Sequence, residues 1–284
     1  MADALSYMAE EARRLDRDRF LCTLFAPEDR RTGLFVLLAF NAEIAKAREM
    51  VSEAMLGEIR LQWWRDSIER IYANPDGDFS DQAVVAELAQ ITKKYNLSRT
   101  LFDQLIDARS RDMIDEPPKD AAELLSYAAA TTATLNVLMM EVLGTCSKEE
   151  LKAAEHVGAA WSLTGILRAS SILAKYKRVY MPQSLMLEGG FDDYEFMAQK
   201  PTPAIAQATH QVVELAQVEI GKARALMGSK AGKAQRAVFL QASLAELYLR
   251  RILKFDCNPF HRKIEAGRAG RQLKLTFKAV RGSF

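Results

Sequence analysis

Hydrophobic and polar residues are mixed along this chain in long stretches, without the strict every-second-residue alternation that is typical of a β-strand. The stretches are rich in Ala, Leu, Glu, Arg, Lys and Gln, all of which favour helix. Eight prolines lie between them, and a proline in a helix interior costs about 3 kcal/mol, so we expect the prolines to mark the joints. The pattern predicts helices at roughly 4–16, 28–50, 53–73, 80–95, 98–114, 120–143, 148–174, 203–227, 232–254 and 268–281.

The helix-start signals and connections along the chain indicate a single domain. Ser147 is followed three residues later by Glu150, which is the capping-box pattern of a helix start. Residues 188–202 (EGGFDDYEFMAQKPT) form the one clear irregular connection. No linker rich in Gly, Ser or Pro divides the chain, and no repeat of fixed period is visible. The sequence therefore predicts one all-α domain over residues 1–284.

Composition narrows the classes of function. The chain has 284 residues, 49% of them hydrophobic, which is enough to fill a sizeable core. Its formal charge of +2 is close to neutral, which excludes a nucleic-acid-binding polycation. Cys22, Cys146 and Cys257 are far apart and odd in number. This spacing favours reduced thiols over a disulfide framework or a structural zinc site.

Signals for membrane insertion and for targeting are weak. No run of about 18 apolar residues is present, so we expect no membrane-spanning helix. The first 20 residues contain acids throughout and lack an apolar centre, unlike a secretory signal or a mitochondrial presequence. We therefore expect the mature protein to begin near Met1 and to stay on the cytosolic side of a bacterial-type membrane.

Other residues that often carry chemistry show no site-forming pattern. His156, His210 and His261 stand alone and lack the H-x-x-x-H spacing of a metal site. Trp63 and Trp64 lie on one predicted helix, and we expect one of the pair to fill the core. No GxGxxG, P-loop or GxSxG motif is present, which counts against nucleotide binding and serine hydrolysis.

Residues 163–182 (LTGILRASSILAKYKRVYMP) resemble the second signature of the squalene/phytoene synthase family, L-x-N-I-L-R-D-x-x-x-D followed by R-x-Y-L-P. Arg168, Arg178 and Tyr180 stand in register with it. Further stretches resemble the family in order and spacing over residues 17–263: DRDRFLCTLFAPEDRRTGLFVLLAFNAEI, LQWWRDSI, LIDARSRDM and LAELYLRRILKFDCNPFHRKI. The resemblance implies a single isoprenoid-synthase-type helical bundle around a central cavity.

Enzymes of this family carry two acidic clusters on facing helices, whose carboxylates hold the magnesium ions that bind and ionise a prenyl diphosphate. In this chain Ala169, Ile172 and Leu173 occupy the positions of the second cluster. Asp112 and Tyr127, by contrast, stand where family members place an aspartate and a tyrosine. The resemblance therefore implies a scaffold that persists without its second set of metal ligands.

The first acidic cluster is also eroded. Alignment on the preceding Ala-Phe dipeptide places Ala45 and Glu49 at its two aspartate positions. Lys46 and Arg48 add positive charge beside them. Glu49 and Glu53 form a residual carboxylate pair, for which a solvated helix face is favoured over a weak metal site. We therefore expect no catalytic residue, no metal and no cofactor, and Mg²⁺ belongs only to an alternative, enzymatic interpretation.

A basic group lies in and after the family-like segment. It consists of Arg168, Lys175, Lys177 and Arg178, with Tyr180 beside them. In the family the arginines at positions 168 and 178 help to hold diphosphate, so the resemblance implies an anion site for a lipid or prenyl head group. The alternative is a set of donors that satisfies nearby backbone carbonyls and carboxylates.

Residues 39–72 (AFNAEIAKAREMVSEAMLGEIRLQWWRDSIERIY) resemble a catalytically eroded subgroup, the complex I assembly factor 6 proteins of mitochondria and their bacterial relatives. This resemblance implies a non-catalytic assembly or accessory factor for respiratory NADH dehydrogenase at the membrane, with complex I subunits or assembly intermediates as partners. Two alternatives stay open. One is a head-to-head prenyltransferase that uses farnesyl or geranylgeranyl diphosphate, and the other is a non-catalytic protein that binds a prenyl or phospholipid ligand.

The C-terminal segment 264–284 is basic, and from residue 262 onward the chain has seven Lys or Arg against one acid. On a helix, its apolar residues form one stripe and its basic residues a neighbouring one: Leu273, Phe277, Val280 and Phe284 beside Lys274, Lys278 and Arg281. This pattern predicts peripheral attachment to the inner face of a bacterial inner membrane, or to the matrix side in a mitochondrial homologue. The alternative is a last helix docked on the bundle with a solvated basic edge.

Overall fold

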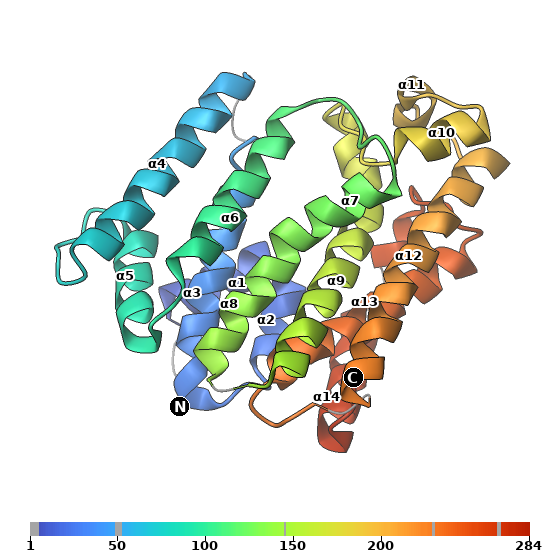
Figure 1. Ribbon diagram of the computed structural model, residues 1–284. Coiled ribbons are helices and arrows are strands. Elements are labelled where there is room, and N and C mark those ends of the chain that lie inside the picture. Colours follow the sequence, from blue (N-terminus) through green and yellow to red (C-terminus); the bar gives the residue numbers. More distant parts are fainter. Residues whose placement is uncertain (1–5, 49–52, 145, 229–230, 266–267) are drawn as a thin grey trace.

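Helix α9 (Lys148–Lys175) runs through the middle of the protein, whose computed structural model is drawn in Figure 1. The structure describes residues 6–48, 53–144, 146–228, 231–265 and 268–284. Helices that precede α9 in the chain lie largely on one side of it, and those that follow lie largely on the other. The arrangement is a bundle of helices, as the sequence predicts.

The other helices fall into two groups, one on each side of α9 along the chain. Before it come α1 (Tyr7–Leu15), α2 (Arg17–Thr23), α3 (Glu28–Ala45), α4 (Ala54–Ala73), α5 (Ala83–Tyr95), α6 (Arg99–Ser110), η1 (Arg111–Met113), α7 (Ala121–Ala128), η2 (Ala129–Ala133) and α8 (Thr134–Leu143). After it come α10 (Gln183–Gly189), α11 (Asp193–Met197), α12 (Pro203–Met227), α13 (Arg236–Lys254), η3 (Arg262–Glu265) and α14 (Arg268–Arg281).

The first predicted helix, 4–16, ends in the structure at Leu15. The next residue, Asp16, has non-helical backbone angles and caps α2, because its carboxylate accepts a hydrogen bond from the backbone N–H of Arg19 at 3.1 Å. Its carboxylate also pairs with the Arg19 side chain. One aspartate thus ends a first helix and begins a second, a division that composition alone does not predict.

Two other predicted segments contain more structure than expected. The irregular connection 188–202 includes α11, which begins with a capping box between Asp192 and Glu195. The predicted helix 120–143 is continuous, but its middle turn, η2, has π-helical geometry. A π-turn inside a helix is uncommon and changes the direction in which the following side chains point.

Helix α9 begins with the predicted capping box: the Ser147 hydroxyl accepts from the Glu150 N–H at 3.1 Å, and the Glu150 carboxylate accepts from the Ser147 N–H at 2.8 Å. Further along, α9 packs against the backbone of the π-turn. A Cβ atom at Gly158 would lie 2.5 Å from the Cα of Ala133 and 2.7 Å from the carbonyl oxygen of Thr132. Only glycine therefore fits at this crossing.

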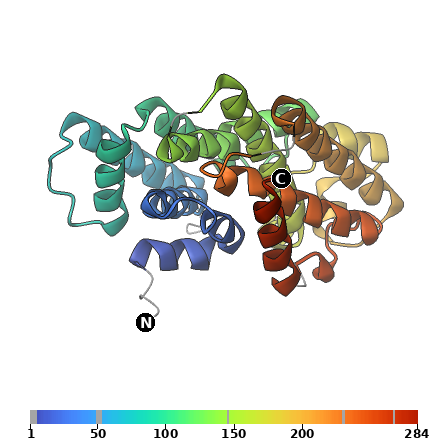
Figure 2. The same cartoon turned by 90° about the horizontal axis from the view of Figure 1, so that it is seen from below.

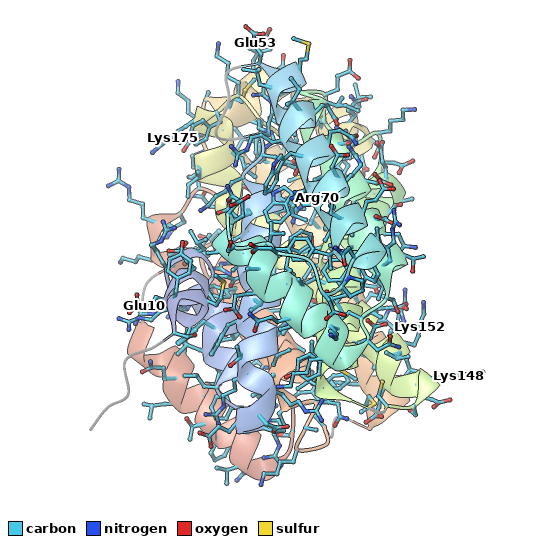
Figure 3. The ribbon with its side chains drawn as sticks, turned by 90° about the vertical axis from the view of Figure 1, so that its left-hand side faces the viewer. Glu10, Glu53, Arg70, Lys148, Lys152 and Lys175 are labelled. Carbon is cyan, nitrogen blue, oxygen red and sulfur yellow. The ribbon has the colours of Figure 1, made fainter. Side chains whose placement is uncertain are left out.

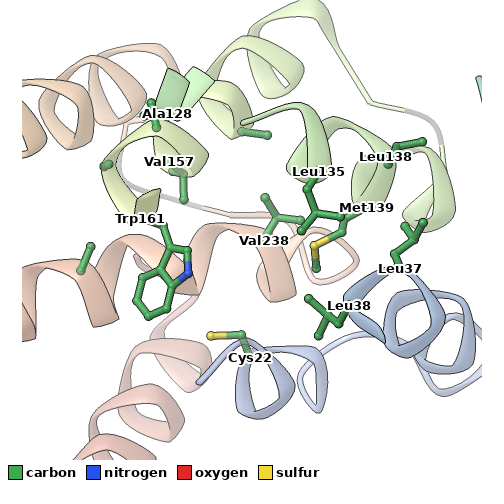
Figure 4. Close-up of a cluster of buried hydrophobic side chains, with 14 of the residues drawn as sticks. Cys22, Leu37, Leu38, Ala128, Leu135, Leu138, Met139, Val157, Trp161 and Val238 are labelled. Carbon is green, nitrogen blue, oxygen red and sulfur yellow. The ribbon is translucent and has the colours of Figure 1, made fainter. Parts of the chain in front are cut away.

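Apolar side chains from several helices converge beside α9 to form the core (Figure 4). Those labelled in the figure include Leu37, Leu38, Leu135, Met139, Val157, Trp161 and Val238. By length and composition alone α9 could cross a membrane, but more than half of its most apolar window is buried inside the protein. Its place in this core accounts for its apolar character.

The last helix, α14, lies beside α13 (Figure 2). Leu275 and Ala279 face the bundle and are buried, and Phe284 packs against Phe239 with ring centroids 5.0 Å apart. The buried position of Phe284 corrects the predicted apolar stripe, of which it is not an exposed member. The rest of that stripe is exposed on the outer face, so α14 is both docked on the bundle and amphipathic toward solvent.

Candidate functional site

The positions of the second acidic cluster lie in the last turns of α9. Ile172 is 58% exposed, whereas Ala169 and Leu173 are half-buried. Magnesium requires hard oxygen ligands, and none of these three side chains contains an oxygen atom, so the donor set on α9 does not fit Mg²⁺. Within the described ranges, no three His, Cys, Asp or Glu side chains gather as they would around a metal ion.

The first acidic cluster is only partly described. Ala45 ends α3 and is half-buried. Glu49 lies outside the described residues, and so does the geometry of the Glu49–Glu53 pair. Glu53 itself is exposed directly before α4, and it projects toward the same end of the molecule as Lys175 (Figure 3).

A hydrogen-bonded group, which we call the Asp112 cluster, joins α3, α6, η1, α7 and the segment after α9. Its members are Asn41, Arg109, Asp112, Tyr127, Arg178 and Tyr180. The Asp112 carboxylate, only 4% exposed, accepts from the hydroxyl of Tyr127 at 2.7 Å and from that of Tyr180 at 2.5 Å. Arg178 donates to the Asp112 backbone carbonyl at 3.0 Å, and Arg109 lies 3.5 Å from the other carboxylate oxygen.

The electrostatics of the Asp112 cluster favour neutral phenols at Tyr127 and Tyr180 and a charged guanidinium at Arg109. Burial, followed by the charge of Asp112, raises the pKa of Tyr127. Burial also raises the pKa of Tyr180, with Tyr127 and Asp112 adding to the effect. Burial alone would lower the pKa of Arg109, but Tyr127 and Asp112 raise it overall. One buried negative charge is thus shared among two cations and two hydroxyl donors, which satisfies it without a ligand.

A cavity of about 210 Å³ opens beside the Asp112 cluster, with Tyr127 and Tyr180 in its wall. Pro118 and a pair between Arg111 and Glu123, 3.4 Å apart, complete its rim. Ligand pockets usually measure about 300–1,000 Å³, so this cavity is small for a prenyl chain.

A second hydrogen-bonded group, which we call the Asp18 cluster, joins α2, α9, α13, η3 and α14. Its members are Asp18, Arg168, Tyr248, Glu265 and Arg271. The buried Asp18 carboxylate accepts from the Tyr248 hydroxyl at 2.6 Å and from Arg271 at 2.8 Å, and it lies 3.1 Å from Arg168. Arg168 in turn donates to both carboxylate oxygens of Glu265, at 2.6 and 3.2 Å.

The guanidinium of Arg168 contacts two carboxylates and two aromatic rings of the protein. It lies 3.7 Å from the ring centroid of Tyr248 and 5.4 Å from that of Trp161. Burial alone would lower the pKa of Arg168, but Glu265, Tyr248 and Asp18 raise it overall. Bidentate pairing with a carboxylate is also the geometry with which arginine binds phosphate, so Glu265 takes the place of such an anion.

The predicted anion-binding residues fall into separate hydrogen-bonded groups. Arg178 and Tyr180 belong to the Asp112 cluster, and Arg168 belongs to the Asp18 cluster. Lys175 and Lys177 are exposed at and after the end of α9. Over the described part of the chain, Arg168 and Arg178 share no hydrogen-bond or ion-pair partner. Both arginines contact carboxylates, and Arg178 also donates to a backbone carbonyl.

Sequence reasoning singled out Asp112, which Arg178 contacts, but not Asp18 or Glu265, the acids that Arg168 contacts. Asp18 and Tyr248 both lie inside the family-like stretches DRDRF and LAELYLRR, which is the signal that would have found them. Glu265 and Arg271 lie beyond the last of those stretches and carry no such signal.

Comparison with known proteins identifies the family. Residues 12–276 match the family model described as squalene/phytoene synthase. The chain belongs to this family. It is similar to NADH dehydrogenase (ubiquinone) complex I, assembly factor 6 of Bos taurus, at 30% identity over 260 residues, which cover 91% of this chain and 77% of the relative. The 15-cis-phytoene synthase of Synechococcus elongatus is 23% identical over 208 residues, covering 68% of this chain and 66% of the relative.

Solved structures of the family share the fold. A dehydrosqualene synthase, crystallised in complex with a ligand, superposes with a TM-score of 0.83 at 13% sequence identity, over 97% of this chain and 95% of that chain. The predicted isoprenoid-synthase-type helical bundle is therefore confirmed.

Proposed function

We propose that this protein is a non-catalytic assembly or accessory factor for respiratory NADH dehydrogenase, complex I. The main support is the extent of the match to proteins named complex I assembly factor 6, which covers 91% of this chain at 30% identity. The match to a phytoene synthase covers 68% at 23% identity. The proposed partners are subunits or assembly intermediates of complex I.

The chemistry of the site supports a role without prenyl transfer. On α9, Ala169, Ile172 and Leu173 provide no ligand for a metal that would stabilise a departing diphosphate. Arg168 and Arg178 already contact buried carboxylates, at Asp18 and Asp112 respectively. A diphosphate would have to displace one of these internal anions and leave it buried with one cation fewer, which is costly.

Deletion of the gene tests the assembly role. The deletion strain should lose assembled complex I on native gels and should lose NADH–ubiquinone activity, and the wild-type gene should restore both. A strain that assembles complex I normally without the protein would contradict the proposal. The non-catalytic part is tested separately with purified protein, magnesium and farnesyl or geranylgeranyl diphosphate. Turnover that Glu49→Ala abolishes would contradict it.

The outer face of α14 supports a peripheral position on the membrane. Leu273, Phe277 and Val280 are 74%, 54% and 80% exposed, and Arg281 stacks over the Phe277 ring at 4.1 Å. Apolar side chains beside a row of basic ones are suited to an anionic bilayer surface, where each basic residue contributes about 1 kcal/mol. The proposed location is the inner face of a bacterial inner membrane, or the matrix side for a mitochondrial homologue.

A further inference from the structure

The proposed function leaves unused a groove between α1, α3, α4 and α5. It encloses about 540 Å³, and we call it the α4 groove. Its walls are formed by Tyr7, Glu43, Ile59, Arg60, Trp63, Trp64, Gln82, Ala83, Val84 and Val85. It lies on the face that Figure 3 turns toward the viewer, on the side of α4 and α5.

One face of α4 is apolar and exposed beside this groove. Met55, Ile59 and Trp63 are 65%, 57% and 40% exposed. Their spacing of four residues places them in one row on the helix, and eight residues of helix extend about 12 Å. Leu56, 42% exposed, widens the row near its start. An exposed apolar row beside a groove marks an interaction surface rather than ordinary surface variation.

The row has a rigid aromatic anchor. Trp64 is buried and packs edge-on against Phe40, with ring centroids 5.1 Å apart. Trp63 packs edge-on against Trp64 at 4.9 Å, so its ring is supported by the core although its outer part meets solvent. The prediction that one of the two tryptophans fills the core is confirmed for Trp64. A supported, half-exposed tryptophan is the kind of residue that dominates binding energy at protein interfaces.

The stretch of chain that contains α4 and the start of α5 is acidic, whereas the whole chain is slightly basic. Residues 53–87 contain eight acids and three bases, a net charge of −5, whereas the full chain has +2. Asp66, Glu69 and Asp81 are among the exposed acids of this stretch. At the groove itself Glu43 is only loosely paired, with 3.9 Å to Arg60. An apolar row with an acidic surround complements a helix that carries apolar residues on one side and basic residues beside them.

We propose that the α4 groove binds a basic amphipathic helix of a partner protein. Apolar side chains of that helix pack on Ile59 and Trp63, and its Lys and Arg side chains face the acids around the groove. The partner that we propose for this groove is a subunit or assembly intermediate of complex I. Only this identity of the partner rests on the proposed function. The groove and α14 lie on different sides of the molecule, so the protein can hold a partner while attached to a membrane (Figures 1 and 2).

Purified full-length protein and a defined probe test the groove. The probe is a labelled helical peptide of about fourteen residues, built from Leu and Lys in amphipathic order, and its counterpart has Glu in place of Lys. Fluorescence anisotropy should show binding of the Lys peptide that weakens with salt, and at least about tenfold weaker binding of the Glu peptide. Equal binding of the two peptides, or no binding of the Lys peptide, overturns the proposal.

Two substitutions locate the binding on the groove. Ile59→Lys removes an exposed apolar side chain and repels a basic helix, so it should weaken Lys-peptide binding by at least about tenfold. Met55→Lys provides the same test at a position that is still more exposed. The matched control is Val218→Lys on α12, which is 51% exposed and should change binding by less than about twofold. Unchanged binding in both α4 variants overturns the proposal.

Two further measurements exclude other occupants. Sedimentation of the purified protein should show a monomer. A dimer that the Ile59→Lys substitution dissociates would mean that the groove binds a second copy of the chain, which would overturn the proposal. Binding to vesicles should be the same for the wild type and the Ile59→Lys variant. If the variant no longer binds vesicles, the apolar row on α4 contacts a membrane, and the proposal is overturned. Complex I assembly in the deletion strain judges the proposed function independently, because peptide binding by the purified protein does not depend on it.

Discussion

Arg178 donates a hydrogen bond to the backbone carbonyl of Asp112 at 3.0 Å and lies 3.4 Å from the Asp112 carboxylate. The arginine occupies a position at which the family resemblance implies a contact with substrate diphosphate. In this chain the guanidinium is buried and its partner is a fixed anion of the protein. The contact between Arg178 and Asp112 thus joins η1 to the segment after α9.

Removal of the Arg271 side chain should destabilise the protein strongly. Arg271 is 5% exposed and donates to the buried Asp18, so Arg271→Ala leaves a buried carboxylate with one cation fewer. We expect a loss of about 3 kcal/mol in the free energy of unfolding, measured by urea titration. Arg281→Ala, at an exposed position of the same helix, is the control and should cost less than about 0.5 kcal/mol. Equal losses for the two variants would mean that Asp18 is satisfied without Arg271.

Gly158 and Gly165 provide a matched pair on α9. Gly158→Ala would place a methyl group 2.5 Å from the Ala133 backbone and should lower the free energy of unfolding by about 1–3 kcal/mol. At Gly165 a Cβ atom meets nothing within 4 Å. Gly165→Ala should therefore raise stability by up to about 1 kcal/mol through helix propensity. Thermal melts of the two variants check the difference, and a stable Gly158→Ala protein would show that α9 and η2 separate easily.

Alkaline pH should weaken the Asp112 cluster. The pKa of Tyr127 is raised by burial and by Asp112, so the folded protein keeps this proton when the unfolded chain loses it near pH 10. The stability that this tyrosine contributes is complete below about pH 10 and declines above it. Urea titrations between about pH 8 and about pH 11 should show a steeper decline for wild type than for Tyr127→Phe. Parallel declines would indicate that Tyr127 ionises equally easily in both states.

Membrane attachment through α14 is best tested with point substitutions. Truncation before α14 would remove Arg271 from Asp18 and so unfold part of the bundle. Phe277→Glu alters only the outer face and should weaken binding to anionic vesicles several-fold, as about 1 kcal/mol or more is lost. Val218→Glu on α12, 51% exposed, is the control. Co-sedimentation that is the same for wild type and Phe277→Glu would refute attachment through this helix.

The sequence predicts much of the fold because helix signals are local. The capping box at Ser147, for example, needs only residues within one turn, and the structure confirms it. The break at Asp16 and the π-turn at 129–133 do not follow from such signals, since both depend on a competition between caps or on tertiary packing. Periodicity places Phe284 on the stripe of a longer helix, but α14 ends at Arg281 and the chain turns inward.

The candidate site is harder to predict than the fold. The sequence shows that Arg168 and Arg178 align with the family motif, but it does not show which carboxylates these arginines contact. Arg168 meets Glu265, 97 positions further along the chain, and Arg178 meets Asp112, 66 positions before it. Such pairings follow from how helices pack, which no local pattern encodes.

The contact between Asp18 and Arg271 joins residues 253 positions apart, and this separation sets an order of events during synthesis. At about 5–20 residues per second, the ribosome exposes Asp18 roughly ten seconds to a minute before Arg271 leaves the exit tunnel. Through that interval the nascent bundle lacks one of the cations that neutralise its buried carboxylate. Helix α14 can therefore dock only after the helices before it have been synthesised, and until then Asp18 has one cation fewer.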